Sequence, residues 1–476
     1  MKRPIFSNMK FIINVLGILI IGILVGCQKD LMQTENPDNQ SAVSLKSAKT
    51  NNFMVISKSE ALPDGLEKKL ADYGEIVNSM SEIGVVVVKP TISNFAKEVG
   101  KLTEVRSVVP DYNAKWLEPG NIQPMANPPS IGDDEPRFYL QWALDAIDAP
   151  EAWNTGIIGE GARVFILDSG IDADNPDLAP NLNSSLCASF VPGEEWDIQP
   201  GEYFNHGTFV AGIVAAADGG GDIIGVAPKA EIVAVKVLSE FTGSGDFSWI
   251  NEGIVYAANN GANVINMSLG ATVSKNGFYI DENDELQKVP AIYVQELILA
   301  QQRAVDYAYK KGVVIVCSAG NGASNYDGNG ALIKLPAELN NVIAVSATAP
   351  DYWAMDYLAG VDPFLDIPSS YTDYGRSLVD IAAPGGDSDF YPQPYWQYDM
   401  ILGIGSDNTY WLSDGTSFAS PHLAGVAALI ISKNGGDITN HSVEKQLLKT
   451  ADKIDTNGKS LFLGNGRVNA YRAVTE

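Results

Sequence analysis

Five continuous apolar runs between residues 163 and 347 constrain the fold of this 476-residue chain more than any other feature. A strand that is apolar along its whole length must be covered on both faces, as in a parallel sheet with helices on either side. The runs are residues 163–168, 232–237, 263–268, 313–318 and 342–347, and helical spacing appears at about 206–217, 247–261, 294–311 and 416–433. The sequence therefore predicts an α/β fold with a doubly wound, mostly parallel sheet.

A smaller unit is expected before this sheet, over residues 51–115. Its pattern alternates between strand and helix in the order β-α-β-β-α-β, which is typical of a small α+β unit with ferredoxin-like topology. Residues 116–138 contain many prolines and little periodicity, so we expect a linker there. Residues 139–476 then form the large domain.

Charge is divided between the same two parts of the chain. Residues 1–115 hold 14 Lys+Arg and 12 Asp+Glu, whereas residues 116–476 hold 18 Lys+Arg and 46 Asp+Glu. All of the net acidity of the chain thus follows residue 115, which makes nucleic acid an unsuitable partner for that part. The alternative reading of these carboxylates is a charged surface that only keeps the protein soluble.

The first 26 residues have the pattern of a secretory signal peptide. Basic residues come first, and an apolar run over residues 11–26 follows that is short for a membrane span. The run ends in Leu-Val-Gly-Cys, which resembles a bacterial lipobox and implies acylation of Cys27. Gln28, by the same resemblance, favours the outer membrane over the inner one. A plain signal peptide is the alternative, and residues 27–50 are expected to be a flexible tether.

Two other cysteines remain. Cys317 lies in an apolar run, which indicates a buried thiol that packs as a small apolar side chain. A disulfide between Cys187 and Cys317 stays open, because an exported protein meets an oxidising compartment.

Three polar residues stand where the chemistry of a parallel sheet gathers, at the carboxyl ends of strands. Asp168 ends the first apolar run, His206 opens a helix, and Ser417 opens the last long helix. Pro421 is expected in the first turn of that helix, where it costs no hydrogen bond. Each residue alone also suits a structural cap. Together, in the chain order Asp, His, Ser, they indicate more than three separate caps, with an exposed hydroxyl at the positive end of a helix.

Several segments resemble the successive motifs of the subtilisin-like serine proteases, and the resemblance covers about residues 139–476. They are VFILDSGID, NHGTFVAGIVAA, NVINMSLG, CSAGNGA and DGTSFASPHLAGVAAL. The resemblance implies that Ser417 is the nucleophile, His206 the general base and Asp168 its orienting acid. It also implies that Asn321 donates its side-chain amide to the oxyanion.

The resemblance further implies two segments that bind an extended substrate by strand addition, and a pocket for the residue before the scissile bond. We expect the pocket to be roomy and mainly apolar, because its residues are small. The segments are Gly243, Ser244, Gly245 and Ser268, Leu269, Gly270, and the pocket residues are Ala319 and Gly320.

Residues 51–115 resemble the inhibitory propeptide of this family. The chemistry itself is expected to need no cofactor, whereas a structural calcium ion is possible. Asp177 matches an acidic calcium ligand of many relatives, but Gly219 stands where a further side-chain ligand is expected. Asp218 or Asp222 could compensate.

The sequence therefore predicts a serine endopeptidase that cleaves proteins or peptides through an acyl-enzyme. Its other expected partners are its own propeptide and, through the lipid on Cys27, the membrane of the cell envelope. A competing class is a peptide-binding or scaffold protein that kept the fold without catalysis. An esterase of another fold is a second alternative, although the chain has no G-x-S-x-G motif.

Overall fold

A computed structural model describes residues 49–116, 122–124, 135–201, 203–219, 221–280, 285–389, 391–455 and 458–476. Residues 1–48, which contain the expected signal peptide, Cys27 and nearly all of the tether, lie outside the described part. Among the residues described, no helix is both long enough and apolar enough to cross a membrane.

The central sheet contains the five strands expected from the apolar runs, and these five run parallel to one another. Its order is β17-β16-β14-β10-β6-β8-β7, with β18 also paired to β16. The five strands are β6 (Arg163–Asp168), β8 (Glu231–Lys236), β10 (Val264–Met267), β14 (Val314–Ser318) and β16 (Ile343–Ala349). The other members are β7 (Ala188–Ser189), β17 (Ile367–Pro368) and β18 (Ile381–Pro384), and only β17 is antiparallel. The predicted fold class is confirmed.

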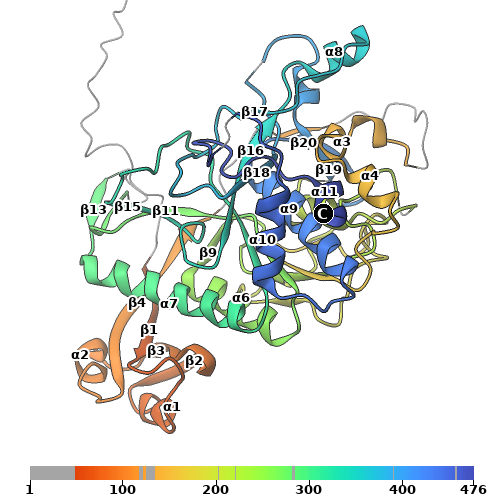
Figure 1. The fold of residues 1–476 in the computed structure, drawn as a ribbon. Coiled ribbons are helices and arrows are strands. Elements are labelled where there is room, and N and C mark those ends of the chain that lie inside the picture. Colours follow the sequence, from red (N-terminus) through yellow and green to blue (C-terminus); the bar gives the residue numbers. More distant parts are fainter. Residues whose placement is uncertain are drawn as a thin grey trace, which may run out of the picture. The chain divides into compact units, whose positions relative to one another are not determined.

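Helices cover both faces of this sheet, as the apolar strands require (Figure 1). Along β6, Val164 and Ile166 belong to one core, whereas Phe165 and Leu167 belong to the other. The first core contains α5 (His206–Ala215) and α9 (Thr416–Lys433), and the second contains α6 (Phe247–Asn259) and α7 (Ala291–Lys310). The two-residue period of a strand therefore divides its side chains between two separate cores.

The smaller unit before the large domain is built as the sequence pattern predicts. It contains β1 (Lys49–Ser57), α1 (Leu66–Leu70), β2 (Gly74–Met80), β3 (Val85–Pro90), α2 (Phe95–Val99) and β4 (Val105–Lys115). The strands pair antiparallel in the order β2-β3-β1-β4. One face of the sheet packs on α1 and α2, and the other joins the core of α6 and α7. The unit thus shares a hydrophobic core with the large domain.

Part of the expected linker also has regular structure. Trp116 is 1% exposed, and β5 (Ile122–Pro124) pairs with β20 (Tyr410–Ser413). β20 in turn pairs with β19 (Ile401–Ile404).

Candidate active site

Asp168 and His206 are in direct contact at the carboxyl end of β6. The Nδ1 atom of His206 lies 2.9 Å from Oδ1 and 3.0 Å from Oδ2 of Asp168. The backbone N–H of Ser169 donates to the same carboxylate at 2.7 Å. Asp168 is 1% exposed, so these donors replace the water that the carboxylate has lost.

The sequence around His206 brings the start of α5 against the loop that follows β6. Asn205 caps the helix, and its Oδ1 accepts a hydrogen bond from the backbone N–H of Thr208 at 2.8 Å. A Cβ atom on Gly207 would lie 2.1 Å from the carbonyl oxygen of Gly170, so only glycine permits this approach. This backbone contact holds His206 beside Asp168.

Ser417 lies in the first turn of α9 and is 8% exposed. Its Oγ donates to the carbonyl oxygen of Ser268 at 3.2 Å, and no hydrogen bond joins it to His206 in this conformation. The rings of His206 and Phe418 are 5.6 Å apart, so the imidazole stands at the same end of α9.

Pro421 lies in the second turn of α9, so its expected place in the first turn is wrong. Because proline has no N–H, the carbonyl of Ser417 has no helical donor. The hydroxyl of Ser268 donates to that carbonyl at 2.6 Å and contacts the Ser420 hydroxyl at 2.9 Å. A side chain from the end of β10 thus completes the hydrogen bonding of the Ser417 backbone.

Asn321 reaches the same place from the loop after β14. Its Oδ1 accepts hydrogen bonds from the backbone N–H of Thr416 at 3.0 Å and from the Thr416 hydroxyl at 2.7 Å. The Thr416 hydroxyl also accepts from the N–H of Gly320 at 3.0 Å. Thr416 therefore orients the amide of Asn321 next to Ser417.

Both predicted substrate-binding segments already hold a peptide, which is the chain's own residues 113–116. β9 (Ser244–Asp246) pairs antiparallel with residues 113–115 at the end of β4. On the opposite side, the N–H of Gly270 donates to the carbonyl of Trp116 at 2.8 Å. The indole N–H of Trp116 donates to the carbonyl of Gly245 at 2.6 Å, and its ring packs edge-on against Phe247. An extended segment of the smaller unit is thus added as a strand between the two.

A small pocket adjoins Ser417, and polar groups and glycines line most of it. Its walls include Ser417, Asn321, Gly320, Gly270, Ser318 and Lys334. Ala319 is instead fully buried, and its N–H is bonded to the carbonyl of Val345 at 2.9 Å. The expectation of a mainly apolar pocket is wrong, because a lysine from β15 (Leu332–Leu335) reaches it.

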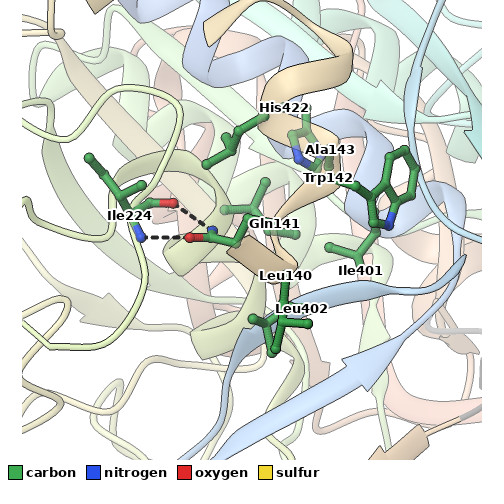
Figure 2. Close-up of a pocket in the computed structure, with 10 residues that line it drawn as sticks. Leu140, Gln141, Trp142, Ala143, Ile224, Ile401, Leu402 and His422 are labelled. Atoms are coloured by element: carbon green, nitrogen blue, oxygen red, sulfur yellow. Dashed lines mark hydrogen bonds between the residues drawn. The ribbon is translucent and has the colours of Figure 1, made fainter. Parts of the chain in front are cut away.

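The loop at residues 217–225 gives little support to a calcium cage. Asp177 is fully buried, and its Oδ2 accepts from the hydroxyl of Tyr410 at 3.0 Å, while Asp222 pairs with Arg137 at 2.9 Å. Figure 2 shows the Gln141 amide bonded to Ile224 through both of its ends, at 2.8 and 3.1 Å. Within the described residues, no three acidic, histidine or cysteine groups are placed to share a metal ion.

The two cysteines are separate thiols in the structure, which answers the question of a disulfide between them. Cys317 is fully buried, and burial raises the pKa of its thiol to about 12. Cys187 is partly buried, and its Sγ accepts from the N–H of Ala234 at 3.2 Å.

Four contributors to the site were absent from the sequence analysis. Trp116 had been placed in the linker, and Thr416 and the Ser268 hydroxyl act through hydrogen bonds that no motif displays. Lys334 had a signal that could have found it, because a lysine in the otherwise apolar strand Leu332–Leu335 needs a buried partner. That partner is Asp373, 39 positions along the chain.

Comparison with known proteins supports the same family. A model described as "Subtilase family" matches residues 159–466. Thermitase from Thermoactinomyces vulgaris is 36% identical over 338 residues, which cover 70% of this chain and 95% of that protein. Subtilisin NAT from Bacillus subtilis subsp. natto is 34% identical over 367 residues, which cover 76% of this chain and 80% of that protein.

Solved structures show the same fold. The epidermin leader peptide processing serine protease from Staphylococcus aureus has a TM-score of 0.68 at 23% identity, covering 89% of this chain and 97% of that one. Fervidolysin from Fervidobacterium pennivorans has a TM-score of 0.66 at 23% identity, covering 90% of this chain and 61% of that one. From the family match and its relatives, the chain belongs to the subtilase family of serine endopeptidases.

Proposed function

We propose that this chain is an exported endopeptidase that hydrolyses peptide bonds through Ser417, His206 and Asp168. The contact of His206 Nδ1 with both carboxylate oxygens of Asp168 carries this proposal. It keeps a proton on Nδ1 and leaves Nε2 as the acceptor that a general base requires. Ser417 stands at the positive end of α9, where negative charge on the attacking oxygen is favoured.

The reaction follows from these positions. Ser417 Oγ attacks the peptide carbonyl, and Nε2 of His206 takes the hydroxyl proton and passes it to the amine as the C–N bond breaks. Water then attacks the acyl-enzyme by the same route and releases the carboxyl product. The side-chain amide of Asn321 and the backbone N–H of Ser417 donate to the tetrahedral oxygen.

The smaller unit is proposed to inhibit the enzyme before maturation. Residues 113–116 occupy the strand position that a substrate needs, with hydrogen bonds to Gly243 at 3.3 Å and to Gly270 at 2.8 Å. A protein substrate therefore has to displace this segment. Further contacts between the unit and α7, such as Arg106 with Glu296 at 3.0 Å, hold it in place.

We propose that the protein reaches the cell envelope through residues 1–26 and a lipid on Cys27. Because the lipid would precede residues 51–115, cleavage within residues 116–138 would free the catalytic domain from its anchor. Immunoblotting of cells and medium tests this by comparing wild type with Ser417→Ala. We expect a shorter, released form in wild type only, and identical full-length, cell-bound protein in both would contradict release.

The catalytic proposal is tested by labelling the protein with a fluorophosphonate, which reacts with an activated serine. We expect labelling of wild type and of Ser432→Ala, a serine at the far end of α9, but none of Ser417→Ala. Labelling of Ser417→Ala would refute the assigned nucleophile. A matured wild-type protein that is neither labelled nor active on casein would favour the peptide-binding scaffold.

The triad and Asn321 supply every group that this chemistry uses, so we propose no cofactor for it. A structural calcium ion stays a prediction that a melting experiment tests. A rise in Tm with added calcium, reversed by a chelator and lost in Asp177→Asn, would establish a site at Asp177.

A further inference from the structure

The chain that follows β16 forms an exposed arm with an apolar surface. The arm contains α8 (Trp353–Ala359), and the backbone N–H of Asp351 closes it by donating to the carbonyl of Phe364 at 3.1 Å. We call residues 351–364 the arm, and Figure 1 shows α8 standing away from the central sheet. Five of its large apolar side chains are between 45% and 68% exposed, and they are Met355, Tyr357, Leu358, Val361 and Phe364. Such a group within one segment indicates an interaction surface, whereas single exposed apolar side chains are ordinary.

The arm rests on a fixed base. Trp353 is buried, and its backbone N–H donates to Oδ1 of Asp399 at 2.8 Å. Asp399 ends the short helix η3 (Trp396–Asp399), and the loop before η3 adds two exposed rings, Tyr391 and Tyr395. A second group of exposed aromatic side chains therefore adjoins the base of the arm.

The arm leaves the sheet at the edge that carries the candidate triad. β14, β16 and β18 are parallel, so their carboxyl ends lie at one edge. The carbonyl of Thr348, three residues before the arm, accepts from the N–H of Gly385 at 2.9 Å. The carbonyl of Gly385 in turn accepts from the N–H of Gly415 at 3.0 Å, and Gly415 comes two residues before Ser417. A long peptide bound at Ser417 can therefore extend to the arm.

The charge of this region restricts what the arm can bind. The arm carries Asp351, Asp356 and Asp362, and Arg376 is the only lysine or arginine between residues 335 and 432. Negative charge of this kind repels anionic lipid headgroups and acidic chains, and it attracts lysine and arginine side chains. Charge complementarity and the apolar surface together fit a peptide segment that combines basic and apolar residues.

We propose that the arm is a second substrate-binding site, which holds a basic and apolar segment of an unfolded protein while another part of the same chain is cleaved at Ser417. The proposal rests on the endopeptidase function proposed above and assigns it a substrate class. Only an unfolded chain offers both these side chains and the extended backbone that strand addition requires. Binding at the arm raises the local concentration of the chain at Ser417, so peptides too short to reach both sites gain nothing.

Binding to the arm is measured in full-length Ser417→Ala. In this protein residues 113–116 fill the strand position, so added peptide has only the arm to bind. The probe is fluorescently labelled apocytochrome c, an unfolded basic protein, and fluorescence anisotropy gives its Kd. We expect Tyr357→Ser combined with Leu358→Ser, which we call the arm variant, to raise Kd by about tenfold through lost apolar contact. An equal Kd for the arm variant and its parent would overturn the proposal.

Charge is tested in the same assay. Asp356→Asn combined with Asp362→Asn should also raise Kd, and added salt should weaken binding to the parent more than to this variant. Tyr471→Ser is the control, because it removes another exposed ring, on α11 (Ala470–Thr475), and should leave Kd unchanged. Tighter binding of β-casein, an unfolded acidic protein, than of apocytochrome c would overturn the role of charge.

Kinetics of the active enzyme separate the two proposals. We expect the arm variant to lower kcat/KM for apocytochrome c by about tenfold, mainly through KM, and to cleave a short quenched fluorescent peptide at the wild-type rate. Normal cleavage of both substrates by the arm variant would refute only the arm. Wild-type protein that cleaves neither substrate and is not labelled by a fluorophosphonate would refute the endopeptidase.

Two other occupants of the arm give different results. A dimer that the arm variant converts to a monomer in sedimentation velocity would overturn the proposal in favour of a second copy of this chain. Binding to vesicles of phosphatidylethanolamine and phosphatidylglycerol that the arm variant loses would overturn it in favour of a membrane. We expect neither change.

Discussion

Two buried aspartates differ in the groups that surround them, and this difference sets the role expected of each carboxylate. One lies at the carboxyl end of β6, and the other lies where the smaller unit contacts the large domain. Asp168 receives hydrogen bonds from the Ser169 N–H and lies against the ring of His206. Asp111, on β4, is fully buried and close to another acid, Asp246. Burial, followed by the charge of Asp246, raises the pKa of Asp111.

The difference is one of charge balance. The environment of Asp168 supplies hydrogen-bond donors and, in the proposed mechanism, a ring that becomes cationic, so a carboxylate suits that position. Asp111 accepts from the Ser248 hydroxyl and faces Asp246, which accepts from the Asn113 side-chain amide at 2.8 Å. The first site therefore suits catalysis, whereas the second makes the contact of the smaller unit sensitive to pH.

The largest effect is expected at the catalytic aspartate. Asp168→Asn keeps the size of the side chain but no longer stabilises the correct tautomer and the imidazolium of His206. We expect kcat to fall by about 10⁴-fold, as for the same change in another serine protease. Steady-state kinetics on one peptide measure this, and a fall of less than tenfold would show that Asp168 does not orient His206.

A smaller loss of activity is expected when Asn321, the proposed donor to the oxyanion, is replaced. Asn321→Ala should lower kcat by about 10²- to 10³-fold with little change in KM, a magnitude that we take from the removal of the side-chain donor in subtilisin. A rise in KM with normal kcat would place Asn321 in substrate binding instead. Ser324→Ala, in the same loop, serves as the control.

The contact of the smaller unit should weaken as pH rises. We call the smaller unit docked when it is in contact with the large domain and separated when it is not. In the docked state, burial raises the pKa of Asp111 to about 8 and that of Asp246 to about 6. The docked state therefore holds protons that the separated state has released. Docking is thus strongest below about pH 4, where both states hold the two protons, and weakens between about pH 4 and 8, by roughly tenfold for each pH unit over which one proton is lost.

Hydrogen exchange of residues 105–116 measures this in full-length Ser417→Ala, after correction for the intrinsic pH dependence of exchange. Protection should fall with pH, and Asp111→Asn should remove much of that dependence. Asp64→Asn, at an exposed position of the same unit, is the control. Equal protection at pH 5 and pH 9 would show that the two aspartates do not govern docking.

The smallest effect is expected from removing the hydrogen bond that the Ser417 carbonyl accepts from the Ser268 hydroxyl. Ser268→Ala leaves the carbonyl of Ser417 without its 2.6 Å donor, which should lower the free energy of unfolding by about 1–3 kcal/mol. Urea unfolding in the Ser417→Ala background measures the change without self-digestion, and Ser432→Ala is the comparison. An unaltered midpoint would mean that another donor reaches this carbonyl.

The sequence alone predicted a mostly parallel sheet and the segments that form its main strands, because continuous apolar runs and helical spacing are local properties of the chain. The contact between Asp168 and His206 was expected from the family resemblance, and the structure contains it. The topology of the smaller unit followed from the same periodicities. The catalytic roles of Ser417 and Asn321 stay predictions that the kinetic tests address.

Only the tertiary structure decided which distant groups share a buried space. It placed residues 113–116 between the two substrate segments, Asp111 beside Asp246, and Lys334 with Asp373 at the pocket. It also put Pro421 beyond the first turn and supplied Ser268 as the missing donor. These outcomes depend on desolvation and on hydrogen bonds between residues far apart in sequence, which no local pattern encodes.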